Sequence, residues 1–304
     1  MSTAGARARR RVDGILLLDK PAGATSNTVL QRVKRIYQAA KAGHTGSLDP
    51  IATGLLPICF GQATKLCGFL LDGDKRYRAV ARLGVKTSTG DCEGEAIANS
   101  DPASLSRPIL ESALTRFLGT QVQTPPMYSA LKHQGLRLYQ LARAGVEVDR
   151  APRQISILEL KLLEGGGDTF AIEVTCSKGS YIRTLVEDIA ASVGQVAHIV
   201  ALRRTAAAPF WSPQMVSFDQ LEAAAGRGLE ELDAMLLPPA TGAASLPRVE
   251  VDDDRAFYLA RGQAVRINAL PDSQAIAVLS PAGQLLGIGR RDADGLLAPS
   301  RWLA

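Results

Sequence analysis

A loop at residues 43 to 54 carries side chains that could do acid, base or nucleophilic chemistry. It reads GHTGSLDPIATG, and its ionisable side chains are His44 and Asp49. The glycines permit backbone angles that other residues avoid, and Pro50 biases Asp49 away from the helical region, so this carboxylate lies on a stiff, extended backbone. A carboxylate presented in this way can stabilise developing positive charge or attack an electrophilic carbon.

The same residues also have ordinary explanations. An Asp-Pro pair commonly opens a turn, and a single loop histidine commonly satisfies neighbouring backbone groups. The loop lacks the patterns GxxxxGK[ST] and GxGxxG, so it does not indicate a nucleotide cofactor. A catalytic role for Asp49 therefore needs support from elsewhere in the chain.

Two further segments contain side chains that could serve a nucleic-acid enzyme. Tyr77 begins an alternating run to Leu83 that is typical of a strand, and its ring could pack in a core or stack on a flipped base. Ser180 is expected to cap a helix whose third position is Arg183. A cation there opposes the helix dipole by about 0.3–1 kcal/mol, so we expect either a nearby anion or an exposed arginine that tolerates the cost.

Residues 43 to 65, GHTGSLDPIATGLLPICFGQATK, resemble the catalytic motif of the tRNA pseudouridine-55 synthase family, the TruB type. Other motifs of that family occur in the expected order and cover most of residues 14 to 210. They are LLLDKPAGATS (16 to 26), DKRYRA (74 to 79), LGVKTSTGDCEGE (83 to 95), PPMYSALKHQGLRLYQLARAGVEV (125 to 148), CSKGSYIRTLVEDIA (176 to 190) and ALRRT (201 to 205). The joint match is far more specific than any one of these segments.

The resemblance implies an isomerase that detaches uracil from the ribose C1′, turns the base and rejoins it through C5. No net oxidation occurs, and no cofactor or metal is implied. Cleavage of the glycosidic bond builds oxocarbenium-like charge at the sugar, which a nearby carboxylate can stabilise or attack. By resemblance Asp49 is the nucleophile, Arg183 pairs with it, and Tyr77 lies against the target base. Covalent attack at C1′ and proton removal at C2′ towards a glycal both remain open.

The remaining candidate site residues rest on the resemblance. Tyr181 and Leu202 match positions that line the base pocket, and His44 matches a histidine that takes up space in the T-loop stack when bases flip out. Flipping makes the reacting atoms accessible, and inserted side chains can partly offset the lost stacking. Lys20-Pro21 match a further motif, which we expect to support the loop of Asp49.

The predicted fold class is α/β (α+β). The resemblance implies the pseudouridine synthase fold, with a mixed, mainly antiparallel sheet flanked by helices. Apolar runs typical of strands occur at residues 14 to 19, 77 to 84, 155 to 161 and 170 to 176. One helix is expected to begin at Thr25 or Ser26 and to end at Gly43. Its basic face, positions 32 to 35, is either solvated or directed at RNA.

Three parts are predicted along the chain. Residues 1 to 12 form a basic flexible tail, residues 13 to 240 the catalytic domain, and residues 245 to 304 a small PUA-like β domain of a kind that the family often carries. The boundary near 240 rests on residues 236 to 244, which are rich in alanine, glycine and proline and typical of a linker. Short apolar runs after it, broken by prolines and glycines, favour β structure.

Net charge says little about RNA binding in this chain. The chain carries +5, four arginines of the tail contribute +4 of it, and residues 245 to 304 hold seven arginines and seven acids. Contacts with RNA phosphates must therefore come from local clusters. The candidates are the helix face at 32 to 35, Lys65, Lys132, Arg137 and Arg143. Each of them could equally be solvated surface charge.

The implied partner is tRNA, contacted at its T-arm and elbow, with no obligatory protein partner and no guide RNA. Two other functions stay in view: a noncatalytic tRNA-folding chaperone, and a catalytic subunit that requires guide RNA and protein partners. The presence of Asp49, Tyr77 and Arg183 argues against the first, although both activities could coexist. The TruB-like order of motifs argues against the second.

The sequence also indicates a compartment. No apolar run approaches the roughly 20 residues of a membrane span, and the N-terminus lacks a signal-peptide pattern. The four cysteines are far apart with no CxxC pair, and the chain has three histidines, so neither a disulfide scaffold nor a zinc site is indicated. We expect a cytoplasmic protein.

Overall fold

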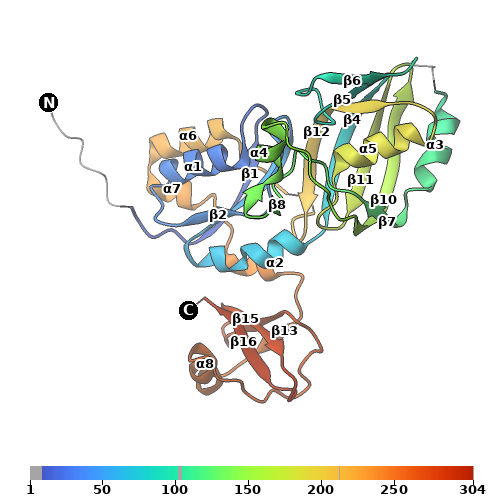
Figure 1. The fold of residues 1–304 in the computed structure, drawn as a ribbon. Coiled ribbons are helices and arrows are strands. Elements are labelled where there is room, and N and C mark those ends of the chain that lie inside the picture. The colour runs from blue at the N-terminus through green and yellow to red at the C-terminus, as the bar shows by residue number, and fades with distance from the viewer. Residues whose placement is uncertain (1–8, 102–104, 212, 304) are drawn as a thin grey trace. The chain divides into compact units, whose positions relative to one another are not determined.

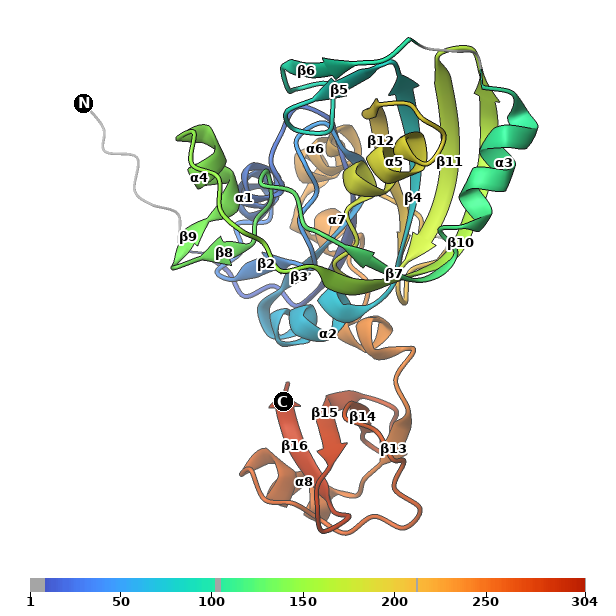
Figure 2. The ribbon, with the colours of Figure 1, turned by 45° about the vertical axis from the view of Figure 1, so that its right-hand side comes forward.

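The computed structural model describes residues 9–101, 105–211 and 213–303, whose elements are shown in Figures 1 and 2. The chain forms two compact units. Unit 1 contains the chain as far as Pro50, then Gly54–Leu71, and the chain from Ala208 onwards. Unit 2 contains Ile51–Thr53 and Asp72–Ala207.

The end of the predicted tail is anchored on unit 1, whereas residues 1–8 lie outside the described residues. The Arg10 guanidinium makes two hydrogen bonds of 2.7 Å to the Asp233 carboxylate and donates to the Tyr37 carbonyl at 2.9 Å. Val12 belongs to the hydrophobic core. A charge pair and the burial of apolar surface therefore fix the backbone at these two positions.

Three strands flank the loop of Asp49. They are β1 (Gly14–Lys20), β2 (Ala42–His44) and β3 (Thr53–Phe60). β3 pairs antiparallel with β1, where Lys20 lies opposite Gly54, and with β2, where His44 lies opposite Ile58. Nearly all of β3 is buried, which accounts for its almost continuous apolar sequence. The loop between β2 and β3 therefore has both of its ends fixed in sheet hydrogen bonds.

Helix α1 (Ser26–Ile36) begins as predicted, because the Thr25 hydroxyl caps it by accepting a hydrogen bond from a first-turn N–H. The expected end at Gly43 is wrong. The helix ends at its C-cap Tyr37, because Gln38 adopts a left-handed conformation with φ 52° and the chain then enters β2. The position of α1 was predicted correctly from its apolar and basic faces. Its end was not, because Gln38 makes the turn that was expected at a glycine.

Helices α1, α6 (Phe218–Arg227) and α7 (Leu229–Asp233) lie together in Figure 1 and share a hydrophobic core with β1 and β3. Tyr37 lies fully buried in this core, with its ring centroid 4.7 Å from that of Phe60. Its hydroxyl donates to the Leu232 carbonyl at 2.9 Å, and burial raises the pKa of Tyr37 above its ordinary value. This core therefore fixes the apolar face of α1.

The predicted linker at residues 236 to 244 is folded against β1. Ile15 and Leu237 exchange two backbone hydrogen bonds of 2.9 Å. A 3-10 helix, η2 (Pro239–Ala243), follows, and a Cβ atom placed on Gly242 would come within 2.8 Å of the Ile15 Cδ1. The small residues of this stretch therefore serve close packing, which composition alone does not distinguish from the flexibility of a linker.

The sheet of unit 2 places β4 (Lys75–Leu83) between two long partners. Its neighbours are β11 (Thr169–Cys176) and β12 (Ala197–Ala207), and the sheet continues from β11 through β10 (Arg153–Gly166) to β7 (Gly119–Gln123). All of these pairs are antiparallel. Along β4, Ala79, Ala81 and Leu83 are buried while Arg78 and Arg82 are exposed. This period of two is why the sequence pattern located the strand.

Helices cover part of that sheet. α5 (Ile182–Ala191) packs on β12 and β4, and α3 (Arg107–Thr115) packs on β10, as Figure 2 shows. The other elements outside the C-terminal region are short. They are η1 (Gly61–Leu66), α2 (Cys67–Asp72), the hairpin pairs β5 (Val85–Thr87) with β6 (Ala96–Asn99) and β8 (Lys132–His133) with β9 (Leu136–Arg137), and α4 (Leu138–Arg143).

Residues from Arg248 to Trp302 form a small β sheet with one helix. Its elements are β13 (Arg248–Glu250), α8 (Asp253–Ala260), β14 (Ile276–Leu279), β15 (Leu285–Arg291) and β16 (Leu297–Trp302), and the strand order is β13-β14-β15-β16. β13 and β14 are parallel and the other pairs are antiparallel. A hydrophobic cluster that includes Val249, Ile276 and Leu297 forms the core of this region. The predicted small C-terminal β domain is confirmed.

The α/β class and the mainly antiparallel sheet flanked by helices are confirmed. Isolated parallel bridges, such as Leu18 with Val216, also occur in the region before residue 245. The strands expected at residues 14 to 19, 77 to 84, 155 to 161 and 170 to 176 correspond to β1, β4, β10 and β11. In the described ranges, no helix has the length and apolar character that crossing a membrane requires.

Candidate active site

The loop of Asp49 is held through the backbone of Leu48. The Ser26 hydroxyl accepts from the Leu48 N–H at 2.8 Å and donates to the Leu48 carbonyl at 3.1 Å. Ser26 is 3% exposed and Leu48 is 7% exposed, so both hydrogen bonds are shielded from water. A buried backbone group that loses such a partner costs about 1–3 kcal/mol, so this contact defines the position of the loop strongly.

The residue after Asp49 is held as firmly. The Lys20 ammonium, fully buried at the end of β1, donates to the Pro50 carbonyl at 3.1 Å and to the Pro21 carbonyl at 2.9 Å. The Gly23 N–H donates to the same Pro50 carbonyl at 2.9 Å. The expectation that Lys20-Pro21 support this loop is confirmed for the Lys20 side chain and the Pro21 carbonyl.

Asp49 therefore lies between two residues whose backbone is fixed by buried partners. Its own side chain is half-buried, and the chain enters β3 at Thr53. His44, also half-buried, is the last residue of β2. Unit 1 thus contains a carboxylate and an imidazole on one firmly held loop, and a rigid setting keeps a reacting group in its productive geometry.

Unit 2 contains two other candidate residues, Tyr77 and Leu202, on neighbouring strands. In the β4–β12 register Tyr77 lies opposite Arg204 and Leu202 lies opposite Ala79. Residues two apart on a strand share a face, so Tyr77 and Leu202 are on the same, largely buried face of the sheet. Tyr77 is half-buried and Leu202 is 8% exposed. An aromatic ring beside an aliphatic side chain is suited to receiving a planar base.

Arg204 on this face was missed by the sequence analysis. It is 1% exposed and lies directly opposite Tyr77. Burial, followed by repulsion from Arg204, lowers the pKa of the Lys75 ammonium to about 8. The sequence did contain one sign of the buried Arg204. In the segment ALRRT a charged residue stands where the alternation of a strand places a buried side chain. Two cations, Lys75 and Arg204, therefore lie buried close to each other on this part of the sheet.

Arg183 is buried in the first turn of α5. The expected cap at Ser180 is wrong: the N-cap is Tyr181, and the Ser180 hydroxyl donates to the Ser177 carbonyl at 3.0 Å instead. Arg183 is consequently the second helical residue rather than the third. At 4% exposure it is not the solvent-exposed arginine that was the alternative interpretation.

An anion that the sequence analysis did not predict, Asp91, lies near Arg183 within unit 2. The Arg183 guanidinium lies 3.9 Å from the Asp91 carboxylate, and both side chains are 5% exposed. It also donates to the Thr89 carbonyl at 2.5 Å and to the Tyr128 carbonyl at 2.7 Å. The pairing of Arg183 with Asp49 stays a prediction, since the two residues belong to different units.

The turn that carries Asp91 is shaped to approach Arg183. Gly90 has φ +75°, and a Cβ atom on it would lie 3.3 Å from the Arg183 Cβ, so glycine suits both its conformation and the available space. The Thr89 hydroxyl donates to the Asp91 carboxylate at 2.5 Å. The sequence analysis matched this segment to a family motif but gave Asp91 no role, although a Thr-Gly-Asp sequence is typical of side-chain-stabilised turns.

Tyr181 is positioned through its backbone and its ring. The Gln123 side chain accepts from the Tyr181 N–H at 2.7 Å and donates to the Tyr181 carbonyl at 3.0 Å. The Arg153 guanidinium lies over the ring, 4.9 Å from its centroid, in a cation–π arrangement. The sequence analysis missed Gln123 and Arg153, because no pattern in their own segments indicates a contact with a residue so far along the chain.

The candidate RNA-contacting side chains differ in their exposure to solvent and in their hydrogen-bond partners. The Lys65 ammonium donates to the Trp302 carbonyl at 2.5 Å and is half-buried. Lys132, Arg137 and Arg143 are exposed and lie close in sequence on β8, β9 and α4. The second group is therefore the better placed for phosphates.

Solved structures with the same architecture identify the class of fold. The chain aligns with a chain of a Cbf5-Nop10-Gar1 complex at a TM-score of 0.77 and 23% identity, covering 96% of this chain and 85% of that one. It aligns with a chain of an archaeal box H/ACA sRNP Nop10-Cbf5 complex at a TM-score of 0.74 and 21% identity, covering 100% and 89%. At this level of identity the likeness shows that the chain shares the fold of those two proteins.

Sequence comparisons identify the family. Residues 34–182 match the TruB family pseudouridylate synthase N-terminal domain, residues 183–242 the tRNA pseudouridylate synthase B C-terminal domain, and residues 247–303 the C-terminal domain of pseudouridine synthase II TruB. The chain is 50% identical over 290 residues to tRNA pseudouridine synthase B of Nitrosococcus oceani, covering 95% of this chain and 94% of the relative. It is 49% identical over 296 residues to the protein of that name in Ectopseudomonas mendocina, covering 97% and 96%. The chain belongs to the TruB family of pseudouridylate synthases.

Proposed function

We propose that this protein isomerises one uridine of the tRNA T-loop, position 55, to pseudouridine, without cofactor, metal or guide RNA. The observation that carries the proposal is the rigid presentation of Asp49, whose two neighbours are held by buried Ser26 and Lys20. Relatives about 50% identical over nearly the whole chain bear the name tRNA pseudouridine synthase B, which supports the choice of substrate.

In the proposed reaction the target nucleotide flips out of the T-loop and the C1′–N1 bond breaks. Uracil leaves with the bonding electrons, turns, and attacks C1′ through C5. C5 then loses its proton and N1 gains one, so no atom is gained or lost overall. Asp49 stabilises the positive charge at C1′ by covalent attack, or it acts by way of proton removal at C2′ to a glycal. Both routes require the carboxylate to be ionised and close to the sugar.

The other candidate residues act on the base and on the carboxylate. Arg183 pairs with Asp49 and keeps it ionised. Tyr77 stacks on uracil and can relay a proton, while Tyr181 and Leu202 line the base pocket. In the proposal His44 occupies the space that the flipped base leaves in the T-loop stack.

The proposed partner surface is the T-arm and elbow of tRNA, in keeping with the exposed cations Lys132, Arg137 and Arg143. We assign residues 13 to 240 to catalysis and residues 245 to 304 to a PUA-like domain. Because that domain has no net charge, its role is to orient the substrate or to stabilise the chain. The tail at residues 1 to 12 adds nonspecific RNA affinity, and the reaction takes place in the cytoplasm.

The test is pseudouridine formation in an unmodified tRNA transcript incubated with the purified chain alone. A second transcript carries cytidine in place of the target uridine. The proposal predicts one pseudouridine in the first transcript and none in the second. Tight binding by folded protein without any product would contradict it and would favour a chaperone or a partner-dependent subunit. Product at other uridines would contradict the assignment of the site.

A further inference from the structure

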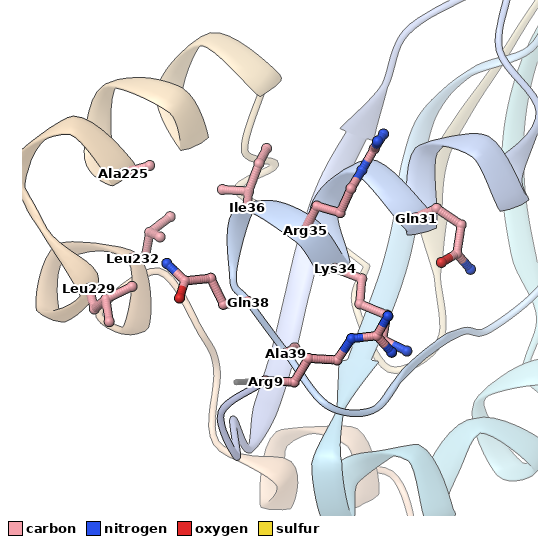
Figure 3. Close-up of a pocket in the computed structure, with 10 residues that line it drawn as sticks. All are labelled: Arg9, Gln31, Lys34, Arg35, Ile36, Gln38, Ala39, Ala225, Leu229 and Leu232. Carbon is pink, nitrogen blue, oxygen red and sulfur yellow. The ribbon is translucent and has the colours of Figure 1, made fainter. Parts of the chain in front are cut away.

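Unit 1 contains a pocket of about 500 Å³ at the C-terminal end of α1 (Figure 3). The N-terminal end of the same helix holds the loop of Asp49 through Ser26. Lys34, which lines the pocket, is eight residues further along, or about 12 Å at a rise of 1.5 Å per residue. The pocket and the contact that holds the loop of Asp49 therefore lie towards opposite ends of one helix.

Three cations, Arg9, Lys34 and Arg35, line this pocket, and no acidic side chain does. Within the described ranges none of the three belongs to a salt bridge. Their neighbours differ, because Arg10 pairs with Asp233 and Arg32 pairs with Glu222. Positive charge in this part of unit 1 is therefore neutralised next to the pocket but not inside it, which favours an anionic ligand.

Figure 3 shows how the side chains are arranged around the pocket. Arg9 and Lys34 extend to one side of α1, whereas Arg35 extends in the opposite direction. Leu229 and Leu232 approach from α7 and provide an apolar wall, and Gln38 extends towards them with its amide. Cations directed to two sides suit an extended polyanion better than a single small anion. The wall and the amide suit a sugar or a base.

Lys34 and Arg35 also have an ordinary explanation, since basic residues in the last turn of a helix interact favourably with its dipole. That explanation does not account for Arg9, which reaches the pocket from a separate segment, or for the apolar wall. It predicts that removing the two charges weakens the helix and leaves RNA binding unchanged.

We propose that this pocket binds the phosphate backbone of RNA flanking the modified loop, with one sugar or base against Leu229 and Leu232. The proposal rests on the proposed function, in which the substrate is tRNA. In this arrangement α1 links two sites: its N-terminal end positions the reacting carboxylate, and its C-terminal end fixes the neighbouring RNA.

The first test compares two double variants of the full chain that remove equal charge. Lys34→Gln with Arg35→Gln removes pocket cations, whereas Arg107→Gln with Arg227→Gln removes exposed cations that already pair with Glu111 and Glu231. The dissociation constant for full-length tRNA is measured across a range of KCl concentrations, and thermal unfolding checks that both variants fold. The pocket variant is expected to bind about tenfold more weakly, with a salt dependence lower by about one unit per lost phosphate contact. The control is expected to change less than about twofold.

The second test blocks the pocket without changing charge. Ala225 lines the pocket on α6, and Ala223 on the same helix is exposed outside the lining. Ala225→Trp is expected to weaken tRNA binding several-fold, and Ala223→Trp to leave it unchanged. Equal effects within either pair of variants, or no effect of the pocket variants on tRNA affinity, would overturn the inference. Failure of the proposed function would show differently, as the absence of pseudouridine with the wild-type chain.

Discussion

Asp49 in unit 1 and Arg183 in unit 2 are held in opposite ways. Asp49 is fixed through the backbone of its neighbours, by Ser26 on one side and Lys20 on the other. Arg183 is fixed through its own guanidinium, by two carbonyls and the Asp91 carboxylate. The first arrangement fixes the backbone on both sides of a carboxylate. The second sets both the position and the electrostatic environment of a buried cation.

This difference has consequences for mutation. A change at Ser26, the uncharged support of Asp49, should move the carboxylate and leave the charges intact. Changes at the supports of Arg183 should alter charge balance and stability together, because an unpaired buried charge is costly. Kinetic measurements that separate turnover from binding, combined with unfolding measurements, can distinguish the two cases.

The largest effect outside Asp49 itself is expected for Arg183→Met. It removes the proposed partner of Asp49 and leaves Asp91 buried without its cation, so turnover should fall by at least about a hundredfold. Breaking a buried pair costs about 3–5 kcal/mol of stability, and unfolding in urea measures that cost. Arg183→Lys keeps the charge but not the planar donors, and it should recover stability more than turnover. Normal turnover in Arg183→Met would remove this residue from the mechanism.

The next effect is expected for Ser26→Ala, which removes both hydrogen bonds to Leu48. Turnover should fall by about tenfold or more with tRNA affinity within a few-fold, because the carboxylate shifts while the RNA-binding surface is unchanged. Thr25→Ala is the matched control: it removes the cap of α1 at a cost of about 1 kcal/mol but no contact with the loop. If the two variants lose turnover equally, helix stability and not loop position is the cause.

A smaller effect is expected for Asp91→Asn, which keeps the shape of the turn and removes its charge. Stability should fall by about 1–3 kcal/mol, because Arg183 loses its buried partner in unit 2. Turnover should fall less than in Arg183→Met, since the guanidinium keeps its two carbonyl acceptors. A loss of turnover equal to that of Arg183→Met would mean that Asp91 does more than position the arginine.

The smallest effect concerns stability and pH. Burial and Arg204 lower the pKa of Lys75 to about 8 in the folded chain, against 10.5 for an ordinary lysine. Between these values the unfolded chain binds more protons than the folded chain, so Lys75 contributes stability that increases with pH, by up to about 3 kcal/mol. Lys75→Met should lack this increase between pH 8 and 10.5 in urea unfolding. Identical pH profiles for the two proteins would contradict the shifted pKa.

Periodicity predicted much of the fold because it reports burial directly. The alternation in β4 and the apolar run of β1 located those strands, and the stripe of α1 located its start. Its end was mistaken because Gln38, not a glycine, takes the left-handed turn. The start of α5 was mistaken by one residue because Gln123, a distant side chain, holds the backbone of Tyr181 where a local serine cap was expected.

The candidate site was predictable only where chemistry and motif coincide. Asp49, Tyr77 and Arg183 were predicted through the segments that carry them, and their roles stay predictions. Asp91 and Arg204 were not, because their importance arises from contacts across long stretches of chain: Asp91 with Arg183, and Arg204 beside Tyr77. A single sequence shows which side chains are present, but such pairings require the fold.

The most direct test of the central claim is single-turnover pseudouridine formation by Asp49→Asn, measured together with its affinity for tRNA. The substitution keeps the shape of the side chain, and the backbone bonds at Leu48 and Pro50 do not depend on the carboxylate. The account predicts loss of product formation with tRNA affinity within a few-fold of wild type. Product formation at a rate close to that of wild type would contradict the assignment of Asp49 as the reacting carboxylate.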